Sequence, residues 1–203
     1  MHGDFGPGMP LSESRLAELL HASRTPVREA LSRLIEERYV ERIAGRGYSV
    51  APITVELIQN LFEVRRLLEG AAAARTARRA DAAVVDRLRA VTSFEYRPGD
   101  EASFKSATDA NAEFHLEVCR ASGNALFVDL VRHCLDQVTR LIALGVDYEP
   151  LQESASDEHR HVVDAIERRD PEAAQEAMER HLDGSSERMM EALVRGGVRA
   201  ITV

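Results

Sequence analysis

The 203-residue sequence predicts a mainly α-helical protein in two parts, a small unit of two short helices and a β-hairpin followed by an all-α bundle. Two observations predict this class. Before residue 53, apolar residues first follow a helical spacing and then form two β-prone runs around a glycine-rich turn. After residue 53, the apolar patterns are all helical. We therefore expect one domain over residues 1–53 and a second over residues 54–203.

The first element predicted is a short amphipathic helix over residues 12–22, with apolar and polar residues on opposite faces. A second helix follows after only about three residues, the tight connection that a helix-turn-helix requires. Ser23 or Thr25 can cap this second helix, and Pro26 suits its first turn. The apolar stripes expected to be buried are Leu16, Leu19 and Leu20 in the first helix and Val27, Ala30, Leu31 and Leu34 in the second.

A β-hairpin is predicted next. The β-prone runs at residues 39–43 and 48–50 flank Gly45-Arg46-Gly47, which places an arginine at the tip of the turn. Two helices in tight succession followed by a hairpin are the order of elements in a winged helix-turn-helix.

Polar residues at the exposed start of the second helix are of the types that reach phosphates and guanine edges in a major groove. For any single arginine, a solvated surface charge is the better explanation. The combination with an arginine-tipped hairpin favours DNA binding instead. The predicted DNA-binding residues are Ser23, Arg24, Thr25, Arg28, Arg46 and Gly47.

Residues 11–50, including the segment SRTPVREAL, closely resemble the DNA-binding domain of the GntR family of bacterial transcription regulators. The resemblance implies binding to a double-stranded operator. Such domains normally open with a helix before the Pro-Gly turn that here is Pro7-Gly8, and only Met1 to Gly6 precede that turn. We therefore expect the first helix to be missing, because of a misassigned start codon or in a domain that is poorly stabilised and binds DNA weakly.

Charge is distributed unevenly along the chain. The net charge is −8, yet residues 1–55 hold seven arginines and seven acidic residues, so the remainder carries the whole excess. An acidic second domain is not expected to lie against DNA. Cys119 and Cys134 sit in apolar helical patterns, which favours a reducing compartment over a disulfide framework. Without a signal-like segment or a long apolar run, we expect a soluble cytoplasmic protein with no membrane partner.

Ala51-Pro52-Ile53 reads as a short extended linker, after which Thr54 can cap the first helix of the second domain. Asp170-Pro171 is a clear helix start, with aspartate at the N-cap and proline in the first turn. The helices predicted in this domain span residues 55–79, 82–93, 101–121, 125–144, 153–168 and 171–195.

Three histidines, His115, His159 and His181, lie on the apolar faces of three different predicted helices. A single buried histidine is usually a core residue satisfied by hydrogen bonds. Three from facing helices of one bundle favour a metal site, because neutral imidazole is the commonest nitrogen ligand of metals in proteins. Asn111, one turn before His115, can supply a fourth ligand. Zinc is the first choice of metal, with nickel or manganese as alternatives.

Residues 56–195 look like the FCD ligand-binding domain found in the FadR-type branch of GntR regulators, through Phe114-His115, residues 121–124, Glu158-His159-Arg160 and His181-Leu182. Metal-binding members use three histidines and an acidic residue four positions before the first. Carried over, these positions are Asn111, His115, His159 and His181. The amide at Asn111 departs from the commoner aspartate and implies lower affinity or a different metal preference.

Arg65 shares a stripe with apolar residues of its predicted helix. An intrahelical ion pair with Glu69 explains it structurally, whereas its family resemblance implies that it binds a small carboxylate effector. The second reading is preferred, because a charge among apolar neighbours needs an anionic partner. Arg140 is a candidate second clamp. His133, on the same face, either lines the cavity or lies on the wet side of its helix.

The sequence thus predicts a homodimeric DNA-binding transcription regulator whose operator binding responds to a small carboxylate in a metal-containing bundle. The family resemblance implies that this regulator is a repressor. An alternative is a regulator in which the ion itself is the signal. A metal-dependent enzyme is a weaker alternative, because no general base stands in a motif such as H-E-x-x-H. We therefore expect no enzymatic activity.

Overall fold

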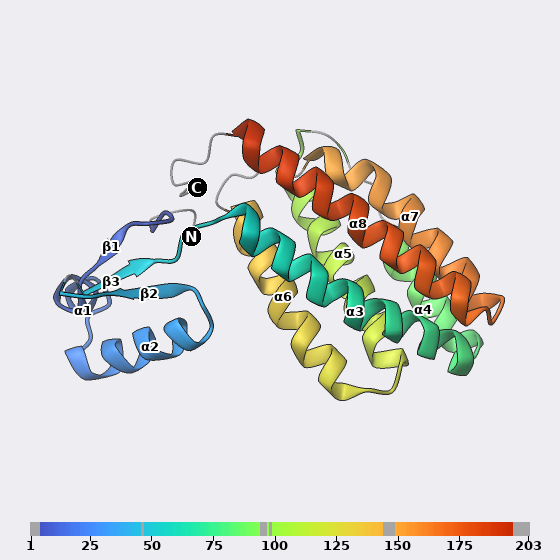
Figure 1. The fold of residues 1–203 in the computed structure, drawn as a ribbon, viewed down its shortest axis with the longest axis horizontal. Coiled ribbons are helices and arrows are strands. Elements are labelled where there is room, and N and C mark those ends of the chain that lie inside the picture. The colour runs from blue at the N-terminus through green and yellow to red at the C-terminus, as the bar shows by residue number, and fades with distance from the viewer. Residues whose placement is uncertain (1–4, 46, 94–96, 98, 144–148, 197–203) are drawn as a thin grey trace. The chain divides into compact units, whose positions relative to one another are not determined.

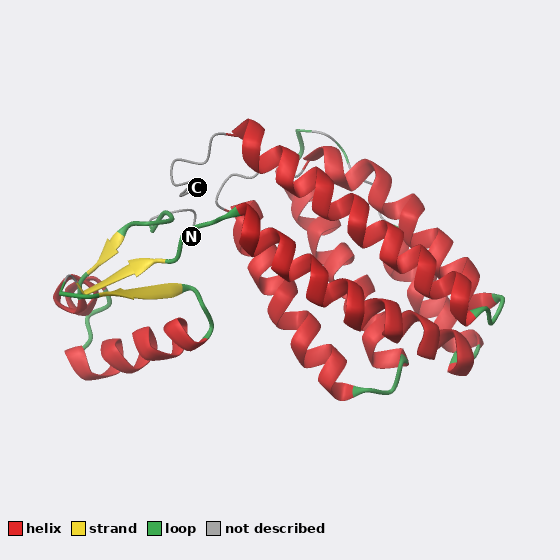
Figure 2. Cartoon of the chain, viewed as in Figure 1, coloured by secondary structure: helices red, strands yellow, loops and turns green. Residues whose placement is uncertain are grey.

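The computed structural model describes residues 5–45, 47–93, 97, 99–143 and 149–196 (Figure 1). The chain divides into two compact units, one containing the described residues up to Thr54 and the other spanning Val55–Gly196. Helices dominate, and the strands form one small sheet in the first unit (Figure 2). The predicted mainly α class with a hairpin wing is confirmed.

The N-terminal unit follows the predicted order and adds one strand. Its elements are β1 (Pro10–Leu11), α1 (Glu13–Leu19), α2 (Arg24–Glu36), β2 (Val40–Ile43) and β3 (Gly47–Val50). The sheet is antiparallel with the order β1-β3-β2, and positive φ angles at Gly45 and Gly47 form the turn between β2 and β3. Strand β1 was not predicted from the sequence, because two residues are too few to show an alternating pattern.

The core of this unit is smaller than the apolar stripes of the sequence predict. Its buried members are Leu11, Val27, Leu31, Val40, Tyr48 and Val50. Helix α2 buries Val27 and Leu31 and packs Ile35 against them, so the stripe follows i, i+4 and i+8. Ala30 and Leu34, on the edge of that stripe, are exposed, contrary to the prediction.

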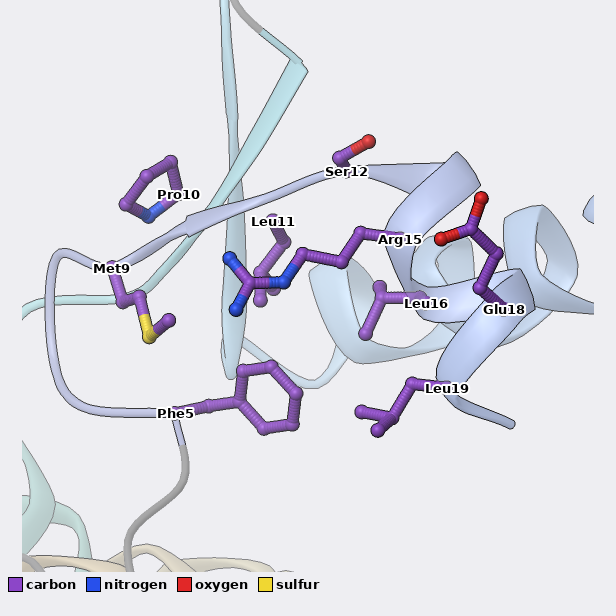
Figure 3. A pocket seen from close by; sticks show the side chains of 9 residues that line it. All are labelled: Phe5, Met9, Pro10, Leu11, Ser12, Arg15, Leu16, Glu18 and Leu19. Atoms are coloured by element: carbon purple, nitrogen blue, oxygen red, sulfur yellow. The ribbon is translucent and has the colours of Figure 1, made fainter. Parts of the chain in front are cut away.

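The apolar face of α1 also departs from the prediction. Leu16 packs on the core, but Leu19 and Leu20 are 59% and 62% exposed. Leu19 lines a groove of about 650 Å³ whose other lining residues are Phe5, Met9, Pro10, Leu11, Ser12, Arg15, Leu16 and Glu18. Figure 3 shows the Phe5 ring pointing toward Leu16 and Leu19. A helix of seven residues presents one narrow face to the core, so part of its apolar surface borders this groove instead.

The C-terminal unit is the predicted helical bundle. Its helices are α3 (Val55–Arg79), α4 (Ala82–Thr92), α5 (Glu101–Ala121), α6 (Ala125–Ala143), α7 (Glu149–Glu167) and α8 (Pro171–Gly196). Helices α3 and α8 run side by side, and α7 packs along α8 (Figure 1). Asp170 caps α8 as expected, since its Oδ1 accepts a hydrogen bond from the Ala173 amide at 3.0 Å. No helix among the described residues is long and apolar enough to cross a membrane.

Hydrogen bonds between α3 and the end of α5 fix how these two helices lie against each other. Thr76 donates its hydroxyl to the Val118 carbonyl at 2.9 Å, and Arg75 and Arg79 both donate to the Ser122 carbonyl. Gly123 follows with φ of +73°, and a Cβ there would overlap the Arg79 guanidinium. These hydrogen bonds fix how far α3 is shifted along α5. This shift determines which residue of α3 lies next to His115.

Candidate metal centre and nucleic-acid interface

Three imidazoles from three helices meet inside the bundle. His115 on α5, His159 on α7 and His181 on α8 are 1%, 0% and 3% exposed. The Nε2 atom of His181 lies 3.2 Å from Nε2 of His159 and 3.3 Å from Nε2 of His115. The candidate ligand atoms of all three lie within 4.8 Å of one another.

This spacing fits a single divalent ion. Zn–N bonds of about 2.0–2.1 Å in tetrahedral geometry place neighbouring ligand nitrogens about 3.3 Å apart. The two closest Nε2 separations match that edge length. The His159 ring also stacks on Phe114, with ring centroids 3.9 Å apart, so its orientation is set by packing. The residues present therefore fit a bound metal.

A buried carboxylate on α3 lies next to Nδ1 of His115, the ring nitrogen that does not face the other two histidines. Glu69 is fully buried, with Oε1 accepting a hydrogen bond from Arg65 Nε at 2.6 Å. Its other oxygen, Oε2, lies 2.5 Å from Nδ1 of His115, a contact that is close but falls short of linear hydrogen-bond geometry. An ionised carboxylate oxygen at that separation repels a nitrogen lone pair, so we assign the proton of the neutral ring to Nδ1. The Nε2 lone pair of His115 then faces the other two rings.

A second carboxylate does the same for His181. Oε2 of Glu158 lies 2.6 Å from Nδ1 of His181. With the Nδ1 proton directed to the carboxylate in both His115 and His181, two Nε2 lone pairs face each other across 3.3 Å. Lone pairs at that distance repel each other unless a cation lies between them. The donor set thus favours a cation at the point where the rings meet.

Burial and neighbouring charges keep the imidazoles neutral. Burial lowers the pKa of His115 to about 4, although Glu69 opposes this shift. Burial, followed by the charges of His181 and His115, lowers the pKa of His159 well below its usual value. Burial also lowers the pKa of His181. Burial would raise the pKa of Glu69, but Arg65 and His115 bring it to about 2, so this carboxylate is ionised. Neutral imidazole is the form that binds metals.

Arg65 lies beside this centre through its contact with Glu69. It is 2% exposed, its guanidinium lies over the Phe62 ring at 5.1 Å, and its buried Nη2 has no hydrogen-bond partner among the described residues. Both readings from the sequence therefore have a basis, because the pair with Glu69 exists and one donor remains available. A buried guanidinium donor without a partner is an anchor for a carboxylate.

The remaining predicted bundle residues differ in their placement. Asn111 is 7% exposed and stands one turn before His115 on α5. Arg140 is half-buried, with Nη1 3.5 Å from Oε1 of the buried Gln137. The His133 side chain is exposed, which favours the wet-side alternative for this residue.

Sequence analysis missed two functional candidates, because it treated Glu69 only as a helical partner of Arg65 and gave Glu158 no role. The available signal for Glu69 was its place in the buried stripe of α3, four residues after Arg65. Glu158 is half-buried and directly precedes His159, so only the packing of α7 on α8 turns it toward His181.

At the start of α2, the predicted DNA-reading residues are accessible. Ser23 is the N-cap, although its hydroxyl makes no capping hydrogen bond, and the helix begins at Arg24. Arg24 and Thr25 are exposed. The backbone N–H groups of Ser23, Arg24 and Thr25 precede the first intrahelical hydrogen bond, whereas Pro26 has no N–H. Together with the positive end of the helix dipole, these N–H groups favour a phosphate contact there.

Arg28 has a partner that the sequence did not predict. Its Nε and Nη2 donate to the two carboxylate oxygens of Glu13 at 3.0 and 2.8 Å, and the Tyr48 hydroxyl donates to Glu13 Oε1 at 3.1 Å. The hydrogen bond from Arg28 lowers the pKa of Glu13, which is therefore ionised. The Arg28 side chain is still 63% exposed. Glu13 thus holds the guanidinium in one orientation while leaving its outer edge accessible.

The tip of the wing is described only in part. Arg46 lies outside the described residues. Gly47 is exposed and begins β3, with φ of +92°. Only glycine adopts that conformation without strain, so its role in the turn is structural.

Together, the two units define a class of protein. A winged helix-turn-helix with accessible arginines, joined in one chain to a helical bundle with a buried polar centre, is the arrangement of a DNA-binding transcription regulator with a ligand-sensing domain. Family models agree, because the model of bacterial regulatory proteins of the gntR family matches residues 1–50 and the FCD domain model matches residues 60–184. The chain belongs to the GntR family of transcription regulators and carries an FCD domain.

Characterised relatives are also regulators. The chain is 26% identical over 197 residues to the Nta operon transcriptional regulator of Aminobacter aminovorans, covering 97% of this chain and 91% of that protein. It is 30% identical over 198 residues to the Glc operon transcriptional activator of Escherichia coli K12, covering 86% and 78%. It is 25% identical over 187 residues to the transcriptional repressor RspR of the same bacterium, covering 92% and 82%. The protein is therefore a regulator and not an enzyme.

Solved structures share the fold. A GntR transcriptional regulator from Rhodococcus sp. RHA1 has a TM-score of 0.72 at 23% identity, covering 94% of this chain and 91% of that one. The FCD domain of TM0439, described as metal-free, has a TM-score of 0.56 at 18% identity, covering 70% and 98%. At these identities the likeness shows the fold alone.

Proposed function

We propose that this regulator is a repressor that binds its operator as a homodimer and changes its operator affinity when a small carboxylate binds in its metal-containing FCD domain. The observation that carries the proposal is the convergence of three Nε2 atoms near Arg65, whose buried Nη2 has no hydrogen-bond partner in the described part of the chain. In this proposal the domains are residues 1–53 for DNA binding and 54–203 for effector binding and dimerisation.

Each winged helix would read half of a pseudo-palindromic operator, since a two-fold symmetric dimer matches a two-fold symmetric site. The proposed contacts come from Ser23, Arg24, Thr25 and Arg28 at the start of α2. Arg46 and Gly47 of the wing would approach the neighbouring backbone or groove. Because operator DNA lies in the bacterial cytoplasm, the regulator would act there.

In the FCD domain, His115, His159 and His181 would hold the metal, with the Asn111 amide oxygen as a further ligand. Zinc is proposed, with nickel or manganese as alternatives, because imidazole suits all three. When bound, the ion would supply a Lewis-acidic position that attracts an anion. Arg65 would donate from Nη2 to the same carboxylate, and Arg140 would be a second clamp. The exposed His133 is left out of this site.

Binding at the centre alters DNA affinity only if the effector prefers one placement of the two DNA-binding units, which typically supplies about 1–3 kcal/mol of coupling. Both an activator and a repressor stand among the relatives. We propose repression, relieved by the effector.

The proposal predicts that zinc alone and zinc with a carboxylate act differently on operator binding. The test uses a duplex selected by the full-length protein from a random pool, with fluorescence anisotropy as the readout. Zinc-loaded protein should bind the duplex, and members of a panel of small mono-, di- and tricarboxylates should weaken binding by about 5–150-fold, the range of ordinary allosteric coupling.

Chelator-treated protein is the reference. Should zinc by itself switch operator binding while no carboxylate has an effect, the ion would be the signal and the carboxylate proposal would be wrong. Should neither zinc nor any carboxylate shift the anisotropy curve, the sensing role of the bundle would fail while the DNA-binding assignment stood.

A second prediction concerns DNA reading. Arg28→Ala should lower affinity for the selected duplex by about 5–150-fold, because a well-placed base contact is worth about 1–3 kcal/mol. Affinity for a scrambled duplex should change much less. Arg33→Ala is the matched control, since Arg33 is exposed in the last turn of the same helix. An unchanged ratio of specific to scrambled binding in the Arg28 variant would rule out a base-reading role.

A further inference from the structure

Glu158 of α7 is the carboxylate behind His181, and it is held more tightly than a surface glutamate. Arg188 of α8 donates from Nη1 to Glu158 Oε1 and from Nη2 to Glu158 Oε2, both at 3.0 Å. The same Nη2 donates to the Ser185 hydroxyl at 3.2 Å. A forked pair of this kind fixes the plane of a carboxylate as well as its position.

This arrangement sets the chemical form of His181. Oε2 of Glu158 is 2.6 Å from Nδ1 of His181, and the two hydrogen bonds from Arg188 hold the Glu158 carboxylate in that position. The carboxylate accepts a hydrogen bond from Nδ1–H of His181, which leaves the Nε2 lone pair directed at His115 and His159. Without this partner, the buried His181 ring could carry its proton on Nε2, where it would block a metal ion.

The two carboxylates behind the rings are not equivalent. Glu69 is fully buried behind His115, whereas the Glu158 side chain is 27% exposed. A recess of about 120 Å³ opens next to it and is lined by Glu158, His161, Ala177, Arg180 and His181. The contact between Glu158 and His181 therefore borders this recess, whereas the contact between Glu69 and His115 joins two side chains that are almost completely buried.

We infer that Glu158, clamped by Arg188, is a positioning residue that sets how tightly the three-histidine centre holds its metal and how fast the metal leaves. This inference rests on the metal centre of the proposed function. Glu158 does not touch the ion in this assignment. It acts by holding the His181 ring and its proton in place at the border with solvent.

The test uses zinc-loaded full-length protein, with competition and release into excess chromophoric chelator. Glu158→Gln should weaken zinc binding by about 10–100-fold, the usual effect of removing an outer partner of a ligating histidine, and should speed zinc release to a similar extent. Arg188→Gln should shift both quantities in the same direction. This second variant keeps the test decisive if the first does not fold. Glu167→Gln is the matched control, because Glu167 is also on α7 and pairs with an arginine, Arg89, away from the histidines.

Imidazole ¹⁵N spectra of the metal-free proteins distinguish two roles of Glu158, namely positioning of the His181 proton and a simple effect of the carboxylate charge. In the parent protein His181 should carry its proton on Nδ1, and in Glu158→Gln the population should shift toward Nε2–H. Unchanged zinc affinity in Glu158→Gln and Arg188→Gln would overturn the inference alone. Weaker binding with an unchanged His181 tautomer would also overturn it, in favour of a simple charge effect. Failure of the parent protein to retain zinc would instead remove the proposed metal centre.

Discussion

Arg65→Met is expected to lower the free energy of unfolding of the bundle by about 3–5 kcal/mol, the cost of removing one partner from a buried ion pair. Glu69 would remain fully buried, having lost both the charge of Arg65 and the hydrogen bond from Arg65 Nε at 2.6 Å. Denaturant unfolding of chelator-treated protein, followed by circular dichroism, measures the difference. The expected loss of free energy of unfolding is large because the Glu69 carboxylate is fully buried, and not because it makes many contacts.

Two further variants make this prediction sharp. Arg66→Met is the matched control, since Arg66 is the next residue of α3 and forms exposed pairs with Glu179 and Asp183; its cost should be at most about 1 kcal/mol. The double variant Arg65→Met with Glu69→Leu should recover much of the stability, because apolar side chains can replace a buried ion pair. Equal losses for Arg65→Met and Arg66→Met would contradict the account of Glu69 as a buried charge.

His159→Gln is expected to abolish stoichiometric zinc binding, with affinity lower by about 100-fold or more, since loss of a direct ligand should exceed the about 10–100-fold effect of an outer partner. Glutamine fills much of the space beside Phe114, so the bundle should remain folded. Elemental analysis after gel filtration gives the zinc content per chain.

His133→Ala is the control for this variant, because His133 is an exposed histidine of the same domain. It should retain a full equivalent of zinc. A full equivalent in His159→Gln would refute the three-histidine centre, and a loss in both variants would mean that the zinc measured is bound at the surface.

Much of the fold was predictable because helix signals are local. The bounds of α3 and α5 match the predicted ranges, and α8 starts at the predicted Asp170-Pro171 pair. The start of α7 differs by four residues, since the helix begins at Glu149 and not at the predicted residue 153. In the N-terminal unit, apolar spacing identified both helices but overstated how much of them is buried, as Leu19 and Leu34 show. Periodicity reveals that a helix has an apolar face, and only the neighbouring elements decide how wide a part of it is covered.

The candidate site was predictable to the same degree. The inward direction of His115, His159 and His181 follows from their helical neighbours, and the structure brings the three rings together. Which group stands behind each ring did not follow from these patterns, because the contacts join residues 46 and 23 positions apart in the chain, Glu69 with His115 and Glu158 with His181.

Residue types and their spacing were enough to predict the class of this protein, a winged helix-turn-helix followed by a helical bundle with three inward histidines. These features depend on residue type and on spacing within a single helix or strand, where the backbone geometry alone fixes which residues share a face. The packed helices were needed to reveal that Glu69 links Arg65 to His115, that Arg188 binds Glu158 next to His181, and that Glu13 binds Arg28. Such pairings depend on the height and rotation at which separate helices pack, and that geometry is set by the whole core at once.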